Sequence, residues 1–339
     1  MQPEGQLQRL WRTSGAVKWT VAALLLVLLF NYFFTAGFFS IEIKEGRLYG
    51  SLVDIAERAV PVLLLTLGMS LVIATGGIDL SVGAVMAISG ASAALLVNQQ
   101  SGWNFGVILL ISLMTGLVAG LWNGVLVAFL QLQPIVATLI LMVAGRGIAQ
   151  LLTDGQIITF DHAVFNFLGS GYLLGLPFAV LLVCLCYILT SLFLRQTAAG
   201  LFIEATGDNP VASWYAGLKI KQIKLMVYGF SGFCAALAGL IAASDIKAAD
   251  SNNVGAWLEL DAILAVVLGG AALTGGRFHL LGAFLGAVLI QTVTTTILTR
   301  AVPVQLTYVV KALVIIIVCL AQSEELRRII RLPYQRKTQ

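Results

Sequence analysis

The chain has 339 residues, of which 59% are hydrophobic and 11% are charged, and its formal net charge is +4. A soluble globular domain carries about 25% charged residues, so this composition excludes an ordinary soluble protein of this size. The small net positive charge is not arranged as a nucleic-acid footprint, so we expect no nucleic-acid partner.

Apolar stretches of about the length that a bilayer requires, roughly 17–25 residues, predict a helical membrane protein. About ten follow one another, at 17–39, 59–75, 80–97, 105–130, 135–152, 173–194, 225–243, 260–273, 280–298 and 304–321. The first is too long for a signal-peptide core, so we expect the mature protein to keep it. The predicted fold is an all-α integral membrane domain at 17–321, flanked by an N-terminal tail at 1–16 and a basic tail at 322–339.

Basic residues predict how the spans are oriented. Ten spans place both ends of the chain on one side, and that side also holds the loop 195–224. Its basic residues are Arg9, Arg12, Lys18, Lys219, Lys221, Lys224, Arg327, Arg328, Arg331, Arg336 and Lys337. The positive-inside rule therefore places both termini and this loop in the cytoplasm of a bacterial inner membrane.

A short sequence occurs twice at breaks between apolar stretches. Thr75-Gly76-Gly77 is followed by Gly83-Ala84, and Thr274-Gly275-Gly276 is followed at the same spacing by Gly282-Ala283. We interpret the pair as two related halves, each with a glycine-rich break that permits bends or close helix contacts. The alternative is a coincidence in a glycine-rich chain.

The loop 195–224 contains a predicted short helix. Asn209 before Pro210 is typical of an N-cap and a first helical position, and Gly217 after Ala216 is typical of a helix end. So short a helix is marginal alone, so we expect it to rest on a surface. That surface is either a partner or the rest of this protein.

Three motifs, in this order, resemble the bacterial ABC-type sugar permeases of the ribose, arabinose and galactose group. They are ATGGIDLSVG at 74–83, the set Glu204, Ala205, Gly207, Asn209, Ala212, Ala216 and Gly217, and ELDAILAVVLGG at 259–270. The match covers about residues 50–320. Within the group, 120–124, 133–150 and 257–260 resemble the galactofuranose permeases, whereas Ser213 and Trp214 depart from the common cytoplasmic motif.

This resemblance implies a set of partners and a role for the short helix. The partners are a second permease subunit, a cytoplasmic ATPase with two ATP-binding domains, and a periplasmic sugar-binding protein. In the galactofuranose system the second permease is a different but related chain, and the alternative is a second copy of this one. The sequence contains no G-x-x-x-x-G-K-[ST] motif, so ATP and Mg²⁺ are expected on the ATPase and no cofactor on this chain. The short helix would then be the coupling helix, seated in the ATPase.

Polar residues inside the spans are candidates for the path or for internal pairs. Arg146, Glu259, Asp261 and Lys311 form either buried pairs or an outer vestibule. Asp79 and Ser81 are expected to cap a helix that starts at Leu80. Further candidates, which line the path or join helices by hydrogen bonds, are Trp122, Asn123, Thr138, Gln150, Gln291, Thr292, Thr294, Thr295 and Thr296.

A polar segment before the span at 260–273 is the candidate docking site for the binding protein. It contains Asp245, Lys247, Asp250, Asn252 and Asn253.

Two other functions compete with a permease driven by ATP. An ion-coupled secondary transporter also fits helical repeats with glycine breaks, but it predicts an acid at a span centre, and none is unambiguous. A membrane metalloenzyme is disfavoured because His162 and His279 are the only histidines and no H-E-x-x-H motif occurs. The four cysteines fall in apolar stretches and are interpreted as core residues, and no catalytic residue is expected.

Overall fold

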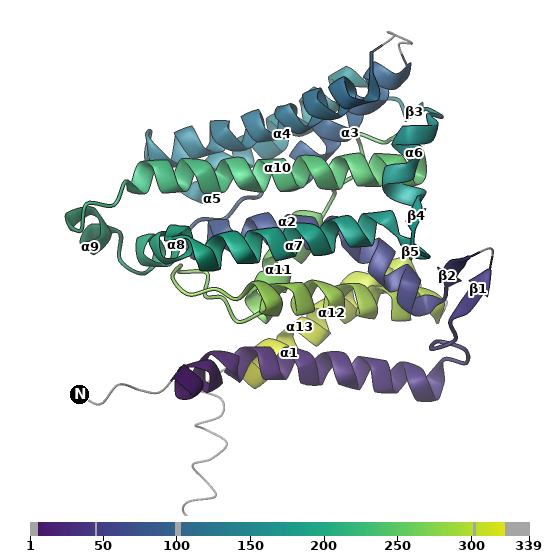
Figure 1. Cartoon of the computed structure of the whole chain (residues 1–339), viewed down its shortest axis with the longest axis horizontal. Helices are drawn as coiled ribbons and strands as arrows, with labels where there is room; N and C mark the ends of the chain where they lie inside the picture. Colours follow the sequence, from purple (N-terminus) through teal and green to yellow (C-terminus); the bar gives the residue numbers. More distant parts are fainter. Residues whose placement is uncertain (1–5, 45, 99–102, 301–302, 323–339) are drawn as a thin grey trace, which may run out of the picture.

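The computed structural model describes residues 6–44, 46–98, 103–300 and 303–322, and these form a layered bundle of long, roughly aligned helices (Figure 1). The helices are α1 (Gln6–Phe34), α2 (Ser51–Ala74), α3 (Val82–Asn98), α4 (Phe105–Ala128), α5 (Pro134–Leu152), α6 (Ala163–Ser170), α7 (Phe178–Gln196), α8 (Ala199–Asp208), α9 (Pro210–Tyr215), α10 (Ile220–Ile246), α11 (Leu258–Leu268), α12 (Leu280–Thr299) and α13 (Val304–Gln322). The strands are β1 (Glu42–Lys44), β2 (Arg47–Tyr49), β3 (Ile158–Thr159), β4 (Tyr172–Leu173), β5 (Leu176–Pro177) and β6 (Ala248–Ala249).

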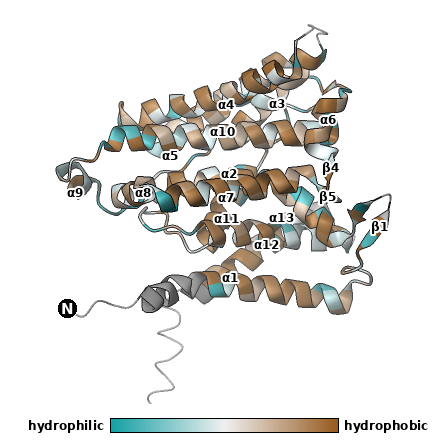
Figure 2. Cartoon of the chain, in the orientation of Figure 1, coloured by the Kyte–Doolittle hydropathy of each residue, from teal (hydrophilic) through white to brown (hydrophobic). Residues whose placement is uncertain are grey.

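The all-α membrane fold is confirmed, but ten full spans are not. Seven helices of the described residues are long and apolar enough to cross a bilayer: α1, α2, α4, α5, α7, α10 and α12. Figure 2 shows these helices mostly in brown, the hydrophobic end of the scale, with scattered white and teal residues. Helix α11 has 11 residues, about 16 Å at 1.5 Å per residue, which is about half of a 30 Å hydrocarbon core. The apolar composition of 260–273 predicted a span there, yet the helix ends early.

The bundle has two different ends (Figure 1). One end carries α8 and α9, and we name it the coupling end. The other carries α6 and the β-strands, and we name it the hairpin end. There β1 pairs with β2, β4 with β5, and β3 with β6, all antiparallel. The basic tail and residues 1–5 lie outside the described residues.

Helices α2, α10 and α12 occupy the centre of the bundle. Most of their residues are buried, whereas few residues of α1, α4, α5 and α7 are. Helix α10 packs on α2, α3 and α4, and α12 packs on α1, α2 and α11. This arrangement leaves broad apolar faces outside for lipid or for another membrane subunit.

Close packing of α4 on α10 depends on a stripe of small residues. Gly116, Gly120 and Gly124 recur every fourth residue and so lie on one face of α4. A Cβ on Gly120 would lie 3.0 Å from the backbone of Gly232, and one on Gly124 would lie 3.0 Å from Leu225 Cα. Glycine lets these backbones touch, which is how membrane helices gain van der Waals contact when lipid is as apolar as the side chains.

Several local predictions require correction. Helix α3 starts at Val82, not Leu80, because Asp79 and Ser81 form a turn before it. Asp245 belongs to α10, so it is not part of the polar loop. The region 195–224 was predicted as a loop with one helix, but α8 precedes α9 and carries Glu204, Ala205 and Gly207.

Candidate functional site

The two Thr-Gly-Gly turns meet at the coupling end. The first turn joins α2 to α3, and the second lies between α11 and α12. The Gly276 N–H donates to the carbonyl oxygen of Ala74 at 2.9 Å. A Cβ on Gly275 would lie 2.8 Å from the Gly76 nitrogen. The contact therefore joins the two repeated segments backbone to backbone.

Left-handed backbone explains why these turns contain glycine. The φ angles are +75° at Gly76, +96° at Gly275 and +95° at Gly276, a region that a side chain disfavours. Gly77 serves a different purpose, since a Cβ there would lie 2.5 Å from the Tyr228 hydroxyl. The Thr75 hydroxyl takes no part in this contact, because Thr75 Oγ1 donates to Val72 O within its own helix at 2.8 Å.

Helix α8 completes this contact, which we name the glycine junction and define as Ala74, Gly76, Gly207, Gly275 and Gly276. A Cβ on Gly207 would overlap the Ala74 carbonyl oxygen and lie 2.5 Å from the Gly276 nitrogen. The backbone of α8 thus rests directly on both turns. Gly207, expected from its motif to take part in coupling to an ATPase, faces the membrane domain.

Helix α9 is built as its sequence predicts and projects from the bundle. Asn209 adopts an extended backbone, and its side-chain oxygen accepts the Ala212 N–H at 2.9 Å. Ser213 Oγ donates to the Ala205 carbonyl at 2.7 Å, which fastens α9 to α8. Past Ala216, Gly217 has a φ of +83° and turns the chain away.

The outer face of α9 is apolar and uncovered. Trp214 is 65% exposed, Val211 and Tyr215 are also exposed, and the two aromatic rings lie edge to face. A cavity of ≈ 690 Å³ opens beside it, between α9 and the α4–α5 connection. On the other side of α8, a cavity of ≈ 410 Å³ is lined in part by Arg195, Glu204 and His279. Burial lowers the pKa of His279, which keeps its imidazole neutral at pH 7.

Asp79 is buried in a hydrogen-bonded cluster, away from any surface. Its Oδ1 accepts the Ser81 N–H and hydroxyl at 3.1 and 2.6 Å, and its Oδ2 accepts the Ser231 hydroxyl at 2.9 Å. The Asn123 side chain donates to Ser81 Oγ at 2.8 Å. Thr138 similarly donates to backbone carbonyls of Pro134 and Ile78. The cluster therefore joins the α2–α3 connection to α4 and α10.

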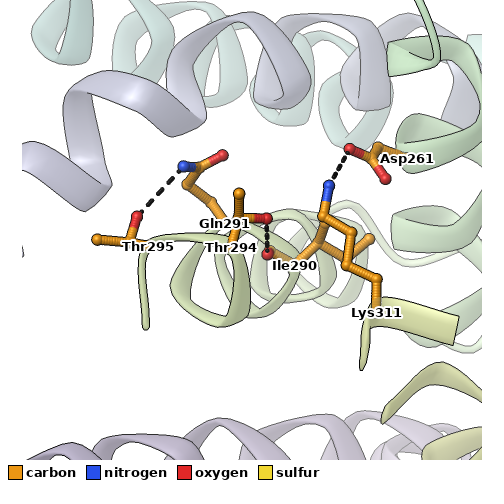
Figure 3. Close-up of polar contacts among 6 residues, drawn as sticks. All are labelled: Asp261, Ile290, Gln291, Thr294, Thr295 and Lys311. Atoms are coloured by element: carbon orange, nitrogen blue, oxygen red, sulfur yellow. Dashed lines mark hydrogen bonds and ion pairs between the residues drawn. The ribbon is translucent and has the colours of Figure 1, made fainter. Parts of the chain in front are cut away.

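The polar residues of α12 also bond within the protein (Figure 3). Gln291 Nε2 donates to Thr295 Oγ1 at 3.3 Å, and the hydroxyls of Thr292 and Thr294 donate to carbonyls one turn earlier. Thr296 accepts from Asn31 of α1 at 2.7 Å. Hydrogen bonds within and between helices account for these side chains in the single chain.

The intramembrane charges are held in two ways. Lys311 Nζ lies 2.8 Å from Asp261 Oδ2, and the two side chains are only 14% and 15% exposed (Figure 3). The Arg146 guanidinium donates to the carbonyls of Ser251 and Val254 at 3.0 and 2.7 Å, and it forms no ion pair with a carboxylate in the described part of the chain. Glu259 is buried, and its Oε2 has no hydrogen-bond partner among the described residues.

The predicted docking segment divides into two parts. Asp245 and Lys247 lie at the end of α10, where Lys247 adopts left-handed backbone and β6 begins. In the turn that follows, Asp250 accepts the N–H groups of Asn252 and Asn253 at 3.0 and 3.1 Å. This turn is bound to α5 by the Arg146 contacts and by the bond between Gln150 and Asn252, so it is less free than a solvated loop.

Sequence reasoning missed the partners that complete these contacts. Ala74, Ser231, Ser251 and Thr153 supply a carbonyl oxygen or a hydroxyl, and Thr153 and Ser251 share a short hydrogen bond. Ser231, Ser251 and Thr153 belong to none of the three motifs, and Ala74 opens the first motif without any sign of its distant contact. Only the packed structure shows that they lie beside residues far away in the sequence.

Comparisons with known proteins identify the family of the chain. Residues 51–319 match the family model described as a branched-chain amino acid transport system / permease component. The chain belongs to this family of ABC-transporter permeases. The match runs from the start of α2 into the last turn of α13 and leaves out α1, and it confirms the resemblance that the three motifs indicated.

Three relatives are sugar-import permeases. The chain is 52% identical over 311 residues to the galactofuranose transporter permease protein YtfT of Escherichia coli, covering 92% of this chain and 91% of that protein. It is 38% identical over 322 residues to the fructose import permease protein FruF of Bifidobacterium longum (93% and 90%), and 36% identical over 264 residues to the ribose import permease protein RbsC of Haemophilus influenzae (77% and 81%). No solved structure matches the chain.

Proposed function

We propose that this permease moves a monosaccharide, galactofuranose or a similar sugar, into the bacterial cytoplasm as one subunit of an ATP-driven importer. The three relatives support a sugar as the substrate, and α9 supports ATP hydrolysis by a partner as the energy source. The observation that carries the proposal is the uncovered apolar face of α9, fixed to α8, which in turn rests on both repeated turns. An exposed aromatic pair on a projecting helix suits a cleft in another protein.

The proposed partner at the coupling end is a cytoplasmic ATPase with two ATP-binding domains, which holds ATP and Mg²⁺. Trp214, Val211 and Tyr215 would enter its cleft, while Glu204, Ala205, Ala212 and Ala216 shape the support behind them. When the ATPase closes, α9 and α8 move as one body because Ser213 joins them. The glycine junction then carries this displacement to α2, which ends at Ala74, and to the connection between α11 and α12.

The remaining partners and the orientation follow from the same arrangement. The coupling end would face the cytoplasm of the inner membrane, with both termini on that side, and the hairpin end would face the periplasm. A sugar-binding protein would dock at the hairpin end, and Asp245 and Lys247 are the charged residues that we propose to orient it. A second permease subunit, a different but related chain, would cover one of the apolar faces of the peripheral helices.

Co-purification tests this partner set. The chain would be expressed with the products of neighbouring genes, purified, and measured by native mass spectrometry. The expected mass is that of two different permease chains with one two-domain ATPase. A variant with Trp214 and Tyr215 both replaced by Ser should lose the ATPase and keep the second permease. Retention of the ATPase by this variant would refute the docking of α9.

An ion-coupled secondary transporter is the alternative function. It would place the buried carboxylate of Asp79 or the Lys311–Asp261 pair in an ion path. Asp79 already accepts three hydrogen bonds within 3.1 Å, and Asp261 is paired, so both have structural partners. The projecting α9 has no role in such a transporter.

A further inference from the structure

Three polar or amphipathic side chains, those of Trp257, Gln150 and Asn252, are exposed on the part of the membrane domain near its hairpin end. Trp257 is 61% exposed, and Gln150 and Asn252 are exposed and joined by a hydrogen bond of 2.7 Å. We propose that Trp257, Gln150 and Asn252 form the sugar-contacting wall of the translocation path. This inference rests on the proposed sugar transport and adds the place where the sugar touches this subunit.

The segment that carries Asn252 and Trp257 re-enters the membrane domain. It leaves β6 at the hairpin end and reaches the start of α11 at Leu258. A Cβ on Gly83, in the first turn of α3, would overlap the Gly255 carbonyl, and Gly145 of α5 lies against Ala84. Gly145 is seven residues, about 10 Å, from the end of α5 at Leu152. The segment thus reaches about 10 Å into the helical layer.

Irregular backbone at this depth requires water or protein around it. In hydrocarbon its unpaired N–H and C=O groups would each cost several kcal/mol, so such segments occur only within protein or beside a water-filled cavity. On one side, protein covers the segment: Arg146 donates to the carbonyls of Ser251 and Val254, and Thr153 bonds Ser251. On the other side, the side chains of Asn252 and Trp257 are exposed, and we infer that this side faces water.

Trp257, whose side chain is exposed, adopts a backbone conformation that is unfavourable in free energy for a non-glycine residue. Trp257 has a φ of +67°, and its residue type gives no reason for left-handed backbone. Holding a non-glycine residue there costs on the order of 1–3 kcal/mol, and such strain occurs mostly at functional sites. A small residue or glycine would relieve it. The structure instead places the largest side chain at this position, beside the free end of a half-helix.

These three side chains together suit a monosaccharide. The indole has a broad apolar face for the C–H face of a sugar ring, and its N–H donates to a hydroxyl. The two amides both donate and accept, so they can exchange hydrogen bonds with hydroxyls of either sense. None of these three side chains is ionised. An uncharged sugar therefore meets only hydrogen-bonding and apolar groups here, which suits a substrate that must be held weakly and then released.

Trp122 of α4 supplies a matched comparison. It is 55% exposed at membrane depth, but its exposed neighbours on the same stripe are Leu110, Met114, Val118 and Val125, all apolar. An exposed tryptophan among apolar residues suits contact with lipid. Trp122 and Trp257 therefore have the same side chain and similar exposure, but Trp122 has apolar neighbours and Trp257 lies near polar ones.

Water access tests the wall without any transport. Trp257→Cys, Gln150→Cys and Trp122→Cys would be treated in intact cells with a membrane-impermeant sulfonated maleimide, over the background of the wild-type chain. We expect Trp257→Cys and Gln150→Cys to react at least tenfold faster than Trp122→Cys. Equal or slower labelling of both wall variants would overturn the proposal, because the face would then be covered by lipid or protein.

Sugar contact is tested in proteoliposomes that contain the complete importer, with ¹⁴C-labelled galactose, fructose and ribose as probes. Trp257→Ala should lower uptake per ATP hydrolysed about tenfold, Trp257→Phe less than threefold, and Trp122→Ala less than twofold. Gln150→Leu should lower uptake per ATP hydrolysed about threefold. This variant provides the test if Trp257→Ala does not assemble into the importer. Unchanged uptake per ATP in Trp257→Ala, or in Gln150→Leu if the former does not assemble, would overturn the proposal. Absence of ATP-dependent uptake by the wild type would instead refute the proposed function, while the labelling rates still decide the wall.

Discussion

Replacing Gly207 by Ala should uncouple ATP hydrolysis from transport. The added methyl group would overlap the Ala74 carbonyl oxygen and lie 2.5 Å from the Gly276 nitrogen. Because such atoms approach no closer than about 3.5 Å without repulsion, α8 must withdraw from the turns by more than about 1 Å. Overpacking of this kind costs about 1–3 kcal/mol, and 1.4 kcal/mol corresponds to a tenfold change in an equilibrium.

The substitution does not weaken α8 itself. Alanine favours helix over glycine by about 1 kcal/mol, so any loss must come from the contact and not from the helix. We therefore expect α9 to remain folded and the ATPase to remain bound. Coupled uptake should fall about tenfold, while basal ATP hydrolysis stays within about twofold of the wild type.

The assay compares two glycine variants in the reconstituted importer. Gly147→Ala on α5 is the control, because it makes the same change in a helix where no atom lies within 4 Å of the new methyl group. Uptake and ATP hydrolysis would be measured in the same proteoliposomes. Normal coupled uptake by Gly207→Ala, at wild-type assembly, would refute the argument that the glycine junction transmits the movement.

Three further changes have expected outcomes. Asn209→Ala removes the N-cap of α9, so it should destabilise that helix by about 1 kcal/mol and weaken ATPase co-purification, whereas Asn209→Asp should restore it; equal recovery with Ala and Asp would exclude a role for the cap. Lys311→Met leaves the Asp261 carboxylate unpaired and should destabilise the purified chain by about 3–5 kcal/mol, measured as a lower Tm. The double variant Lys311→Met with Asp261→Leu should regain most of the lost stability. A double variant no more stable than the single one would contradict the pairing. Arg146→Met removes two hydrogen bonds to the re-entrant segment, so proteolysis near Asn252 should become faster, and an unchanged cleavage rate would show that other contacts suffice.

Local signals predicted some elements well. Asn209, Pro210 and Gly217 define α9 because capping and chain reversal depend on neighbours in the sequence. The breaks at Gly76 and Gly275 were visible for the same reason, since left-handed backbone selects glycine locally.

Long-range features could not be predicted from one sequence. The glycine junction joins residues 74, 207 and 276, and nothing in the spacing of Gly207 indicates that it faces a carbonyl more than 130 residues away. Helix α11 was expected to span the membrane because apolar composition is the same in a half-helix and a whole one. The re-entrant segment before it depends on Arg146, whose partners are backbone carbonyls and so have no sequence signature.

Sugar uptake by the purified proteins tests the central claim most directly. Proteoliposomes would contain this chain alone, or this chain with its second permease, ATPase and sugar-binding protein, and labelled monosaccharide would be followed with and without ATP. The account predicts uptake only by the complete set, dependent on ATP hydrolysis and unaffected by an uncoupler. Uptake by this chain alone that an uncoupler abolishes would contradict it.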